Sequence, residues 1–337
     1  MDIDFVVLWV DGNDPKWLEK RAKFKGEAFQ LGSARYRDWD LMRYWFRAVE
    51  KYAPWVHKIY FVTDNQCPNW LRRDHPKLVM VDHRDFIPEK FLPTFNTNCI
   101  ELNLHRISGL SEYFVAFNDD IFLTQPIEPE NYFSQEGLPC DAPYEMAFYV
   151  PEHSDINHFG VEMYVFRAMC VIRKHFKRNK VIKGNLYKWH GPYMGLKYFF
   201  KSPMLLRQHF VVFGTTHNEK SFLKSVYEEV WQKEVGLLNE SCTHFREDTN
   251  LSNYFIRYWQ LASNKFAPFN VRKNRVAINI GKDCIPGIKT LLNDKQIKSL
   301  CLNDGPACSD ADYEALKPQI ISLFEKMLPE KCSFEID

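Results

Sequence analysis

The stretch FVVLWVDGNDP, residues 5–15, decides the fold class of this sequence. Six apolar residues, Phe5 to Val10, run without interruption into the polar turn Asp11 to Pro15. A short apolar run that is closed by turn-forming residues predicts a buried strand. We expect this strand to begin an α/β sheet.

Strands and helices alternate through the first 120 residues. The predicted strands are 58–63, 78–81 and 113–117, and the predicted helices are 39–51, with Asp38 as N-cap, and 97–110. This alternation predicts a mostly parallel sheet that is flanked by helices. Ligands bind beyond the carboxyl ends of such strands, so we expect the acidic turns after Val10 and Phe117 to lie at a binding site.

Helical periodicity dominates beyond about residue 125. The predicted helices are 161–176, 193–200, 219–235, 251–262, 288–300 and 310–327. We therefore divide the chain into an α/β half, residues 1–135, and a mostly helical half, residues 136–337. Both halves are expected to meet at one cleft and to form one catalytic unit.

The composition excludes several classes of protein. The 337 residues, 45% of them hydrophobic, suffice for a large core. With 44 Lys and Arg against 43 Asp and Glu, the net charge of +1 gives no bulk case for nucleic-acid binding or a polybasic membrane anchor. Nine scattered cysteines without a CxxC pair argue against a disulfide framework or a zinc site.

The apolar run near the start is far shorter than the roughly 20 residues of a membrane span. We therefore expect a cytoplasmic protein in a reducing compartment, with peripheral attachment to the inner face of the membrane left open. The basic stretch 173–188 is either a solvated face or a contact surface for an anionic polymer or a lipid.

The carboxylates Asp119 and Asp120 follow Asn118 directly after the predicted strand 113–117. Adjacent carboxylates at a strand end repel each other and recruit a hard divalent cation, which in turn bridges diphosphate oxygens. The alternative is a structural role, because such pairs also cap turns.

The predicted helix 97–110 has two faces. Ile100, Leu104 and Ile107 form an apolar stripe, whereas Asn98, Glu101 and His105 form a polar one. Because this helix leads into the strand before Asp119 and Asp120, its polar stripe either lines the same cleft or faces solvent.

His217 stands before Asn218, a good N-cap for a helix beginning at Glu219. The positive end of a helix dipole disfavours the imidazolium form. A neutral imidazole accepts a proton from a sugar hydroxyl, which is the task of a general base. The alternative is a local hydrogen-bonding role.

A phosphate-rich substrate also requires positive groups. Arginine binds phosphate through two donors, although most arginines lie on the surface or in ion pairs. The candidates are Arg37, Arg43, Arg106 and Arg246.

Four ordered blocks of sequence resemble the Stealth family of hexose-1-phosphate transferases. The first block is residues 5–15, and the second runs from Arg37-Asp38 through Leu92-Pro93-Thr94-Phe95-Asn96-Thr97-Asn98 to Asn118-Asp119-Asp120. The third runs from His217 to Phe245-Arg246, and the fourth is Cys301-Leu302-Asn303-Asp304. The resemblance covers nearly the whole chain, with a looser match over residues 140–200. That region is expected to select the acceptor.

The resemblance implies a Rossmann-like or glycosyltransferase A-like sheet whose first half binds a nucleotide sugar. It implies transfer of a hexose-1-phosphate, such as GlcNAc-1-phosphate, from a UDP-sugar to a hydroxyl of an oligosaccharide or polysaccharide. UMP leaves and a phosphodiester forms, in capsule or surface polysaccharide synthesis. The implied cofactor is Mg²⁺ or Mn²⁺, and the implied surroundings are membrane-bound polysaccharide machinery.

Residue roles follow from the matched motifs. His217 would be the base, Asp120 and Asp304 catalytic carboxylates and metal ligands, and Arg246 a phosphate clamp. The implied substrate-binding residues are Asp11, Gly12, Asp14, Arg37, Arg43, Asn98, Glu101, His105, Arg106, Asn118, Asp119 and Asn303. The chain departs from the family where it reads Thr216-His217-Asn218-Glu219-Lys220, because prolines often follow the matching histidine; this leaves the acceptor-side geometry open.

Two other functions remain as alternatives. A metal-dependent nucleotide-sugar glycosyltransferase would use the same acidic pair but release UDP. A non-catalytic carbohydrate- or nucleotide-binding module would tolerate Asn at positions 120 and 304.

Overall fold

The computed structural model describes residues 1–26, 37–146, 161–195, 208–305 and 308–336. Its main sheet has the strand order β3-β2-β1-β4-β9. The strands are β1 (Ile3–Leu8), β2 (Ile59–Thr63), β3 (Leu78–Asp82), β4 (Tyr113–Phe117) and β9 (Lys220–Leu223). The first four are parallel and β9 is antiparallel to β4. The order 3-2-1-4 is that of a Rossmann-like sheet, which confirms the α/β prediction.

A second sheet has the order β11-β12-β5. Its strands are β5 (Ile121–Leu123), β11 (Arg275–Ile280) and β12 (Ser299–Asp304). β12 runs parallel to β11 and antiparallel to β5. Two-stranded sheets pair β6 (Cys140–Asp141) with β10 (Ala267–Pro268) and β7 (Glu145–Met146) with β8 (Val212–Phe213). Strands from residues 136–337 therefore complete the sheets of the first half.

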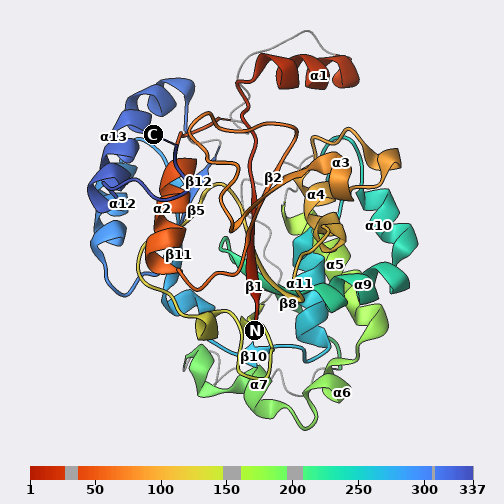
Figure 1. Cartoon of the computed structure of the whole chain (residues 1–337). Helices are drawn as coiled ribbons and strands as arrows, with labels where there is room; N and C mark the ends of the chain where they lie inside the picture. The colour runs from red at the N-terminus through yellow and green to blue at the C-terminus, as the bar shows by residue number, and fades with distance from the viewer. Residues whose placement is uncertain (27–36, 147–160, 196–207, 306–307, 337) are drawn as a thin grey trace.

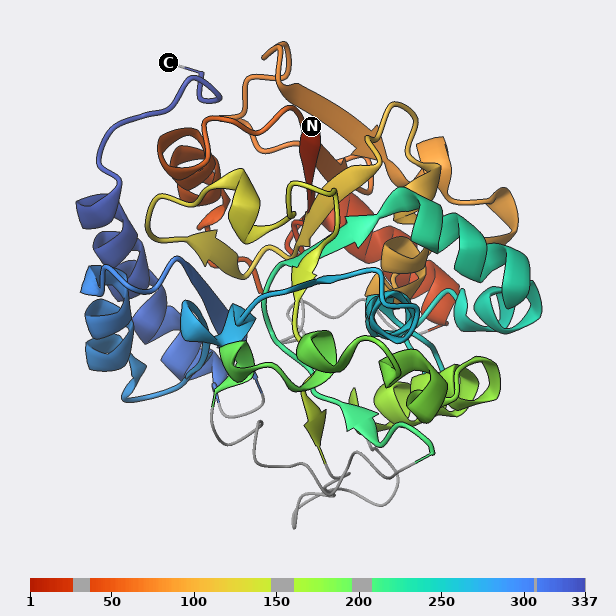
Figure 2. The same ribbon diagram turned by 90° about the horizontal axis from the view of Figure 1, so that it is seen from below.

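Helices cover both sides of the main sheet (Figures 1 and 2). On one side lie α2 (Met42–Tyr52), α12 (Cys284–Asn293) and α13 (Asp310–Met327). On the other lie α3 (His83–Phe86), α4 (Thr97–Asn103), α5 (Val161–His175), α9 (Lys224–Lys233), α10 (Val235–Ser241) and α11 (Asn253–Ala262). Helix α1 (Pro15–Lys25) lies beyond the carboxyl end of β1, whereas α6 (Arg178–Ile182) and α7 (Leu186–His190) lie at the opposite end of the molecule (Figure 1).

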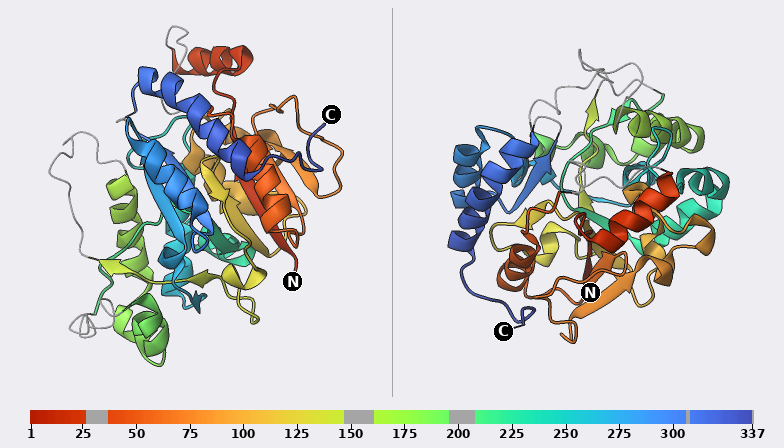
Figure 3. Two further views of the ribbon diagram at one scale, coloured as in Figure 1. Left: turned by 90° about the vertical axis from the view of Figure 1, so that its left-hand side faces the viewer. Right: turned by 90° about the horizontal axis from the view of Figure 1, so that it is seen from above.

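The core forms because the strands are apolar on both faces, as the run at residues 5–10 predicted. The fully buried ring of Phe5 packs on Phe117 with ring centroids 4.8 Å apart, and Trp45 of α2 packs on Phe117 from the side at 5.5 Å. The C-terminal tail crosses this side of the molecule (Figure 3). The buried Arg47 of α2 holds it through Glu335, at 2.6 Å.

Four predicted helices differ from the structure. The helix predicted at 39–51 begins only at Met42, and Asp38 does not cap it. Asp38 instead accepts a hydrogen bond from the amide of Asp40, whose φ of 55° breaks the helical path. The helix predicted at 97–110 ends at Asn103 and continues as a single 3₁₀ turn to Arg106.

The other two differences place strands where helices were predicted. Residues 220–223 form β9, because pairing with β4 buries Phe222 against Phe114. Helix α12 ends at Asn293, and residues 299–304 form β12 between two partner strands. Tertiary pairing overrides local helical periodicity in both cases. The predicted helix 193–200 lies outside the described residues from position 196 onward.

Among the described residues, the helices are each too short or too polar to cross a bilayer.

Candidate active site

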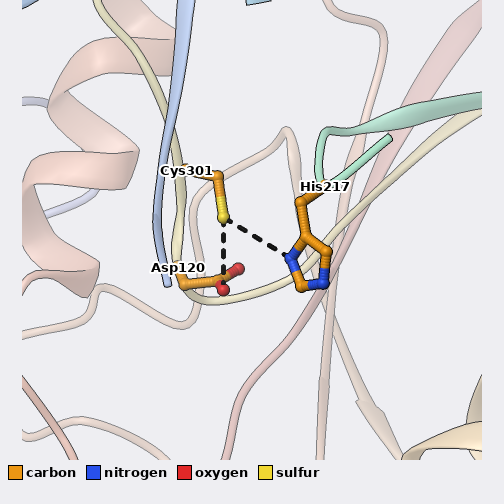
Figure 4. A group of neighbouring side chains, drawn as sticks. All are labelled: Asp120, His217 and Cys301. Atoms are coloured by element: carbon orange, nitrogen blue, oxygen red, sulfur yellow. Dashed lines mark hydrogen bonds between the residues drawn. The ribbon is translucent and has the colours of Figure 1, made fainter. Parts of the chain in front are cut away.

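Three distant segments bring Asp120, His217 and Cys301 together (Figure 4). The Cys301 thiol donates to Asp120 Oδ2 at 3.4 Å and lies 3.9 Å from His217 Nδ1. Asp120 follows β4, His217 precedes β9, and Cys301 lies on β12. The two sheets thus meet at this cluster.

The Asp120 carboxylate has an unsatisfied oxygen. Its Oδ1 is buried and has no hydrogen-bond partner among the described residues. Burial raises the pKa of Asp120, while His217 and the Cys301 thiol oppose that change. A buried oxygen without a partner is costly, so this one indicates a place for a ligand.

The imidazole of His217 is held in its neutral form. Desolvation by the surrounding protein lowers its pKa, the nearby Asp120 opposes this, and Lys220 and Arg246 add to it. The predicted cause, a helix dipole, is wrong, because His217 precedes strand β9 and not a helix. The side chain stays accessible to solvent, as a base that receives a substrate proton must be.

Further carboxylates lie near Asp120. Desolvation and the charges of Asp120 and Asp38 raise the pKa of Asp119 to about 8, although its side chain remains accessible to solvent. Desolvation, Asp40 and Asp11 raise the pKa of Asp38 to about 6. Carboxylates that raise one another's pKa values are stabilised by a cation.

Two positive groups, Lys220 and Arg246, lie near His217. Burial lowers the pKa of Lys220, and the nearby Glu101 and Asp120 oppose that change. The Arg246 guanidinium donates to the Tyr164 hydroxyl at 2.6 Å and covers its ring at 4.8 Å. The predicted Arg246 therefore belongs to the electrostatic surroundings of His217, together with Lys220. The predicted Glu101 lies near these two cations.

The amide of Asn98, also on α4, is buried. Its Nδ2 has no hydrogen-bond partner among the described residues. Like the Asp120 oxygen, this group is available to a ligand.

Asp304 is engaged elsewhere. Its carboxylate accepts from Trp39 Nε1 at 3.1 Å and forms an ion pair with Arg37 at 3.3 Å. Side chains alternate between the two faces of a strand, so Asp304 and Cys301 project from opposite faces of β12. Cys301, and not the predicted Asp304, is the third side chain close to Asp120 and His217. Asn303 donates to Asn279 at 2.7 Å.

The predicted residues of the first block form the turn after β1. The Gln66 amide donates to the Asp11 carbonyl and to the Asp14 carboxylate, each at 3.0 Å. Gly12, which lies between these two residues in the sequence, is buried. Asp14 also caps α1. The turn is thereby fixed beside Asp38, whose pKa the Asp11 charge helps to raise.

Three predicted substrate-binding residues contact aromatic rings of the protein. The His105 ring stacks on Tyr227 with centroids 5.6 Å apart, and burial lowers its pKa to about 3. Arg106 covers Trp231 at 4.7 Å, and Arg43 covers the Trp70 ring at 5.5 Å. These contacts stabilise the helices α4, α9 and α2. Asn118 remains at the site, where its carbonyl accepts the amide of Ile121 at 3.3 Å.

The chain matches two family descriptions. They are "Stealth protein CR1, conserved region 1", over residues 1–27, and "Stealth protein CR2, conserved region 2", over residues 35–141. It is 38% identical to the capsular polysaccharide phosphotransferase WcwK of Streptococcus pneumoniae, over 99% of each chain. It is 39% identical to the receptor polysaccharide phosphotransferase WefC of Streptococcus oralis, again over 99% of each.

A third relative is the exopolysaccharide phosphotransferase cps2G of Lactiplantibacillus plantarum, at 39% identity over 99% of this chain and 96% of the relative. Among solved structures, the galactosyltransferase LgtC aligns over 98% of each chain with a TM-score of 0.39 and 10% identity.

Proposed function

The chain belongs to the Stealth family, and we propose that it transfers a hexose-1-phosphate from a UDP-sugar to a carbohydrate hydroxyl in capsule or exopolysaccharide synthesis. The full-length relatives are polysaccharide phosphotransferases. The observation that carries the proposal is the neutral, solvent-accessible His217 beside a carboxylate with an unpaired oxygen. The acceptor hydroxyl attacks the phosphorus nearest the sugar, the bond to UMP breaks, and the anomeric bond stays intact.

His217 takes the proton of the attacking hydroxyl. A neutral imidazole is ready to accept it, and an imidazolium is not. Desolvation, aided by the charges of Lys220 and Arg246, keeps the imidazole neutral before reaction, and the two cations offset the charge of the diphosphate. Arg246 is already oriented by Tyr164, so little side-chain freedom is lost when it binds a phosphate oxygen.

A divalent cation, Mg²⁺ or Mn²⁺, fits the acidic side of the site. The unpaired Asp120 Oδ1 and the raised pKa of Asp119 both indicate carboxylates that lack a positive partner. When bound, such an ion neutralises charge on the diphosphate and on the leaving group. Mg²⁺ prefers oxygen ligands, so Asp119 and Asp120 would hold it, and the Cys301 sulfur would not. Asp304 stays a predicted ligand, and its carboxylate would first have to break its ion pair with Arg37.

The nucleoside of the donor fits a pocket of 590 Å³ that is lined by residues from the ends of β2 and β3 and from α1. Its lining combines the apolar Ile87 and Leu92 with the ion pair of Lys20 and Asp64. Neighbouring strands in the order β3-β2-β1-β4 are about 4.8 Å apart. A nucleoside diphosphate that lies across the carboxyl ends of these strands therefore reaches from the pocket past Asp11 to Asp119.

The released nucleotide tests this proposal. The protein is incubated with Mg²⁺, a panel of UDP-sugars and oligosaccharide acceptors, and the products are separated. We expect UMP and an acceptor that carries phosphorus. Release of UDP with a phosphorus-free product would instead identify the alternative, a glycosyltransferase. We also propose that the protein associates peripherally with membrane-bound polysaccharide machinery, because the proposed acceptor is a carbohydrate of capsule or exopolysaccharide synthesis.

A further inference from the structure

Residues 163–218 contain 11 Lys and Arg residues and no Asp or Glu, in a chain whose net charge is only +1. Charge is therefore distributed very unevenly along the sequence. A cationic segment of this length attracts an anionic partner. The strength of this attraction depends on which of its Lys and Arg side chains are not already paired within the protein.

Part of this charge is used within the protein. The buried Arg178 forms a two-pronged ion pair with Glu145, at 2.8–3.0 Å. Lys174 pairs with Glu234 at 3.3 Å, and Lys188 donates to the Asn264 carbonyl at 3.1 Å. Glu136 is the acidic group that influences the pKa of Lys188. These partners within the protein neutralise or anchor the three side chains, and Arg178 is buried as well.

Three further lysines of the segment lie on or beside α6, which together with α7 protrudes at the end of the molecule opposite α1 (Figure 1). Lys177, Lys180 and Lys183 are exposed and form no ion pair within the described part of the chain. Gly184, with φ of 81°, turns the chain directly into Leu186 and Tyr187. We define these five side chains, the three lysines with Leu186 and Tyr187, as the α6–α7 tip.

The apolar members of the tip are unusually exposed. Leu186 is 58% and Tyr187 63% accessible, and they are adjacent in sequence. Their exposure does not reflect loose packing, because the next residue but one, Trp189, is buried and donates to Asn264 at 2.8 Å. The tip is anchored by Trp189 and presents an aliphatic and an aromatic group among lysines.

We propose that the α6–α7 tip docks on an anionic lipid bilayer, with Leu186 and Tyr187 inserted at the level of the headgroups. Lysines near an anionic membrane surface and aromatic or aliphatic groups in its interfacial zone are complementary to the two components of such a bilayer. A soluble anionic polysaccharide would use the charge but would have no place for Leu186. The lipid surface therefore explains more of the tip than a polyanion does.

Vesicle sedimentation at 0.1 M NaCl tests the proposal with the full chain. Vesicles of phosphatidylcholine alone are compared with vesicles containing 30 mol% phosphatidylglycerol. We expect binding to the anionic vesicles only. Each lysine contributes a factor of about five, so the triple variant K177Q/K180Q/K183Q should bind about 100-fold more weakly.

The matched control is K289Q/K295Q/K326Q, which removes the same charge from exposed lysines on α12, α13 and the segment between α12 and β12. It should bind like wild type, and both triple variants should retain transfer to a soluble acceptor. L186S/Y187S keeps every charge and should weaken vesicle binding about tenfold. Circular dichroism confirms that each variant is folded.

Three results would overturn the proposal. They are no binding of wild type to the anionic vesicles, equal losses in the two lysine variants, and unchanged vesicle binding by L186S/Y187S together with tight binding to dextran sulfate. The last result would assign the tip to a soluble polyanion.

Discussion

Replacing His217 with Ala tests the role of the imidazole with few side effects. Its side chain is accessible to solvent, and its contact in the site is the 3.9 Å approach to Cys301, which retains Asp120 as hydrogen-bond acceptor. Truncation therefore leaves no buried group newly unpaired, and we expect the free energy of unfolding to change by less than about 0.5 kcal/mol. Donor binding should change little for the same reason.

Catalysis should respond differently. A positioned general base contributes about 10²–10⁴-fold, so the transition state should lose about 3–5 kcal/mol of stabilisation. The fall should appear in kcat, with the donor Kd from calorimetry nearly unchanged. The control is His175→Ala, which removes an imidazole in the last turn of α5 that pairs with Glu234, and it should transfer at the wild-type rate.

The pH profile gives an independent readout. Transfer should be lost as the pH falls, because protonation removes the base. Desolvation lowers the pKa of His217 from 6.5, so the acid limb of kcat should lie below pH 6.5 and disappear in the Ala variant. Turnover within threefold of wild type in His217→Ala, or an acid limb that persists, would refute the role of the imidazole.

Three further predictions concern the metal and the fold. The pKa of Asp119 is about 8, so Mn²⁺ affinity measured by calorimetry should rise as the pH approaches 8. The variant Asp119→Asn should flatten this dependence on pH. A steep dependence in the variant would exclude Asp119 as the titrating ligand. Cys301→Ser should keep Mg²⁺-dependent transfer within tenfold of wild type, and its complete loss would assign the sulfur to the reaction. Asp141→Asn leaves the buried Arg257 without its 2.6 Å partner and should cost about 3–5 kcal/mol in urea unfolding, whereas Asp40→Asn at an exposed ion pair should cost less than about 1 kcal/mol; similar values for the two would contradict this assignment of burial.

The parallel strands of the main sheet could be predicted because their own sequences carry the apolar pattern of a buried strand. The run from Phe5 to Val10 and the strand 113–117 are apolar, and the structure pairs β1, which ends at Leu8, with β4. The strands β9 and β12 could not be recognised in this way. Lys220–Leu223 becomes a strand because β4 offers it a partner, and a partner distant in sequence leaves no local pattern.

The candidate site was predicted only in outline for the same reason. His217 and Asp120 stood out by residue type and position, and the structure brings them together. Cys301 did not, although it lies in the same short block as Asp304. Had the block been recognised as a strand, the alternation of its side chains would have placed the two residues on opposite faces. Asp38 was missed because it was assigned to a helix cap.

The distance between a bound metal and the His217 ring tests the shared site most directly. Mn²⁺ is added to protein labelled at the histidine Cε1 position, and paramagnetic broadening of each histidine signal is measured, with His217→Ala identifying the resonance. We expect the His217 signal to vanish first, and His57, at the amino end of the sheet, to remain sharp. Equal broadening of the His217 and His57 signals, or no broadening of the His217 signal, would contradict the account. It would show that the carboxylates Asp119 and Asp120 and the His217 imidazole do not act on one diphosphate.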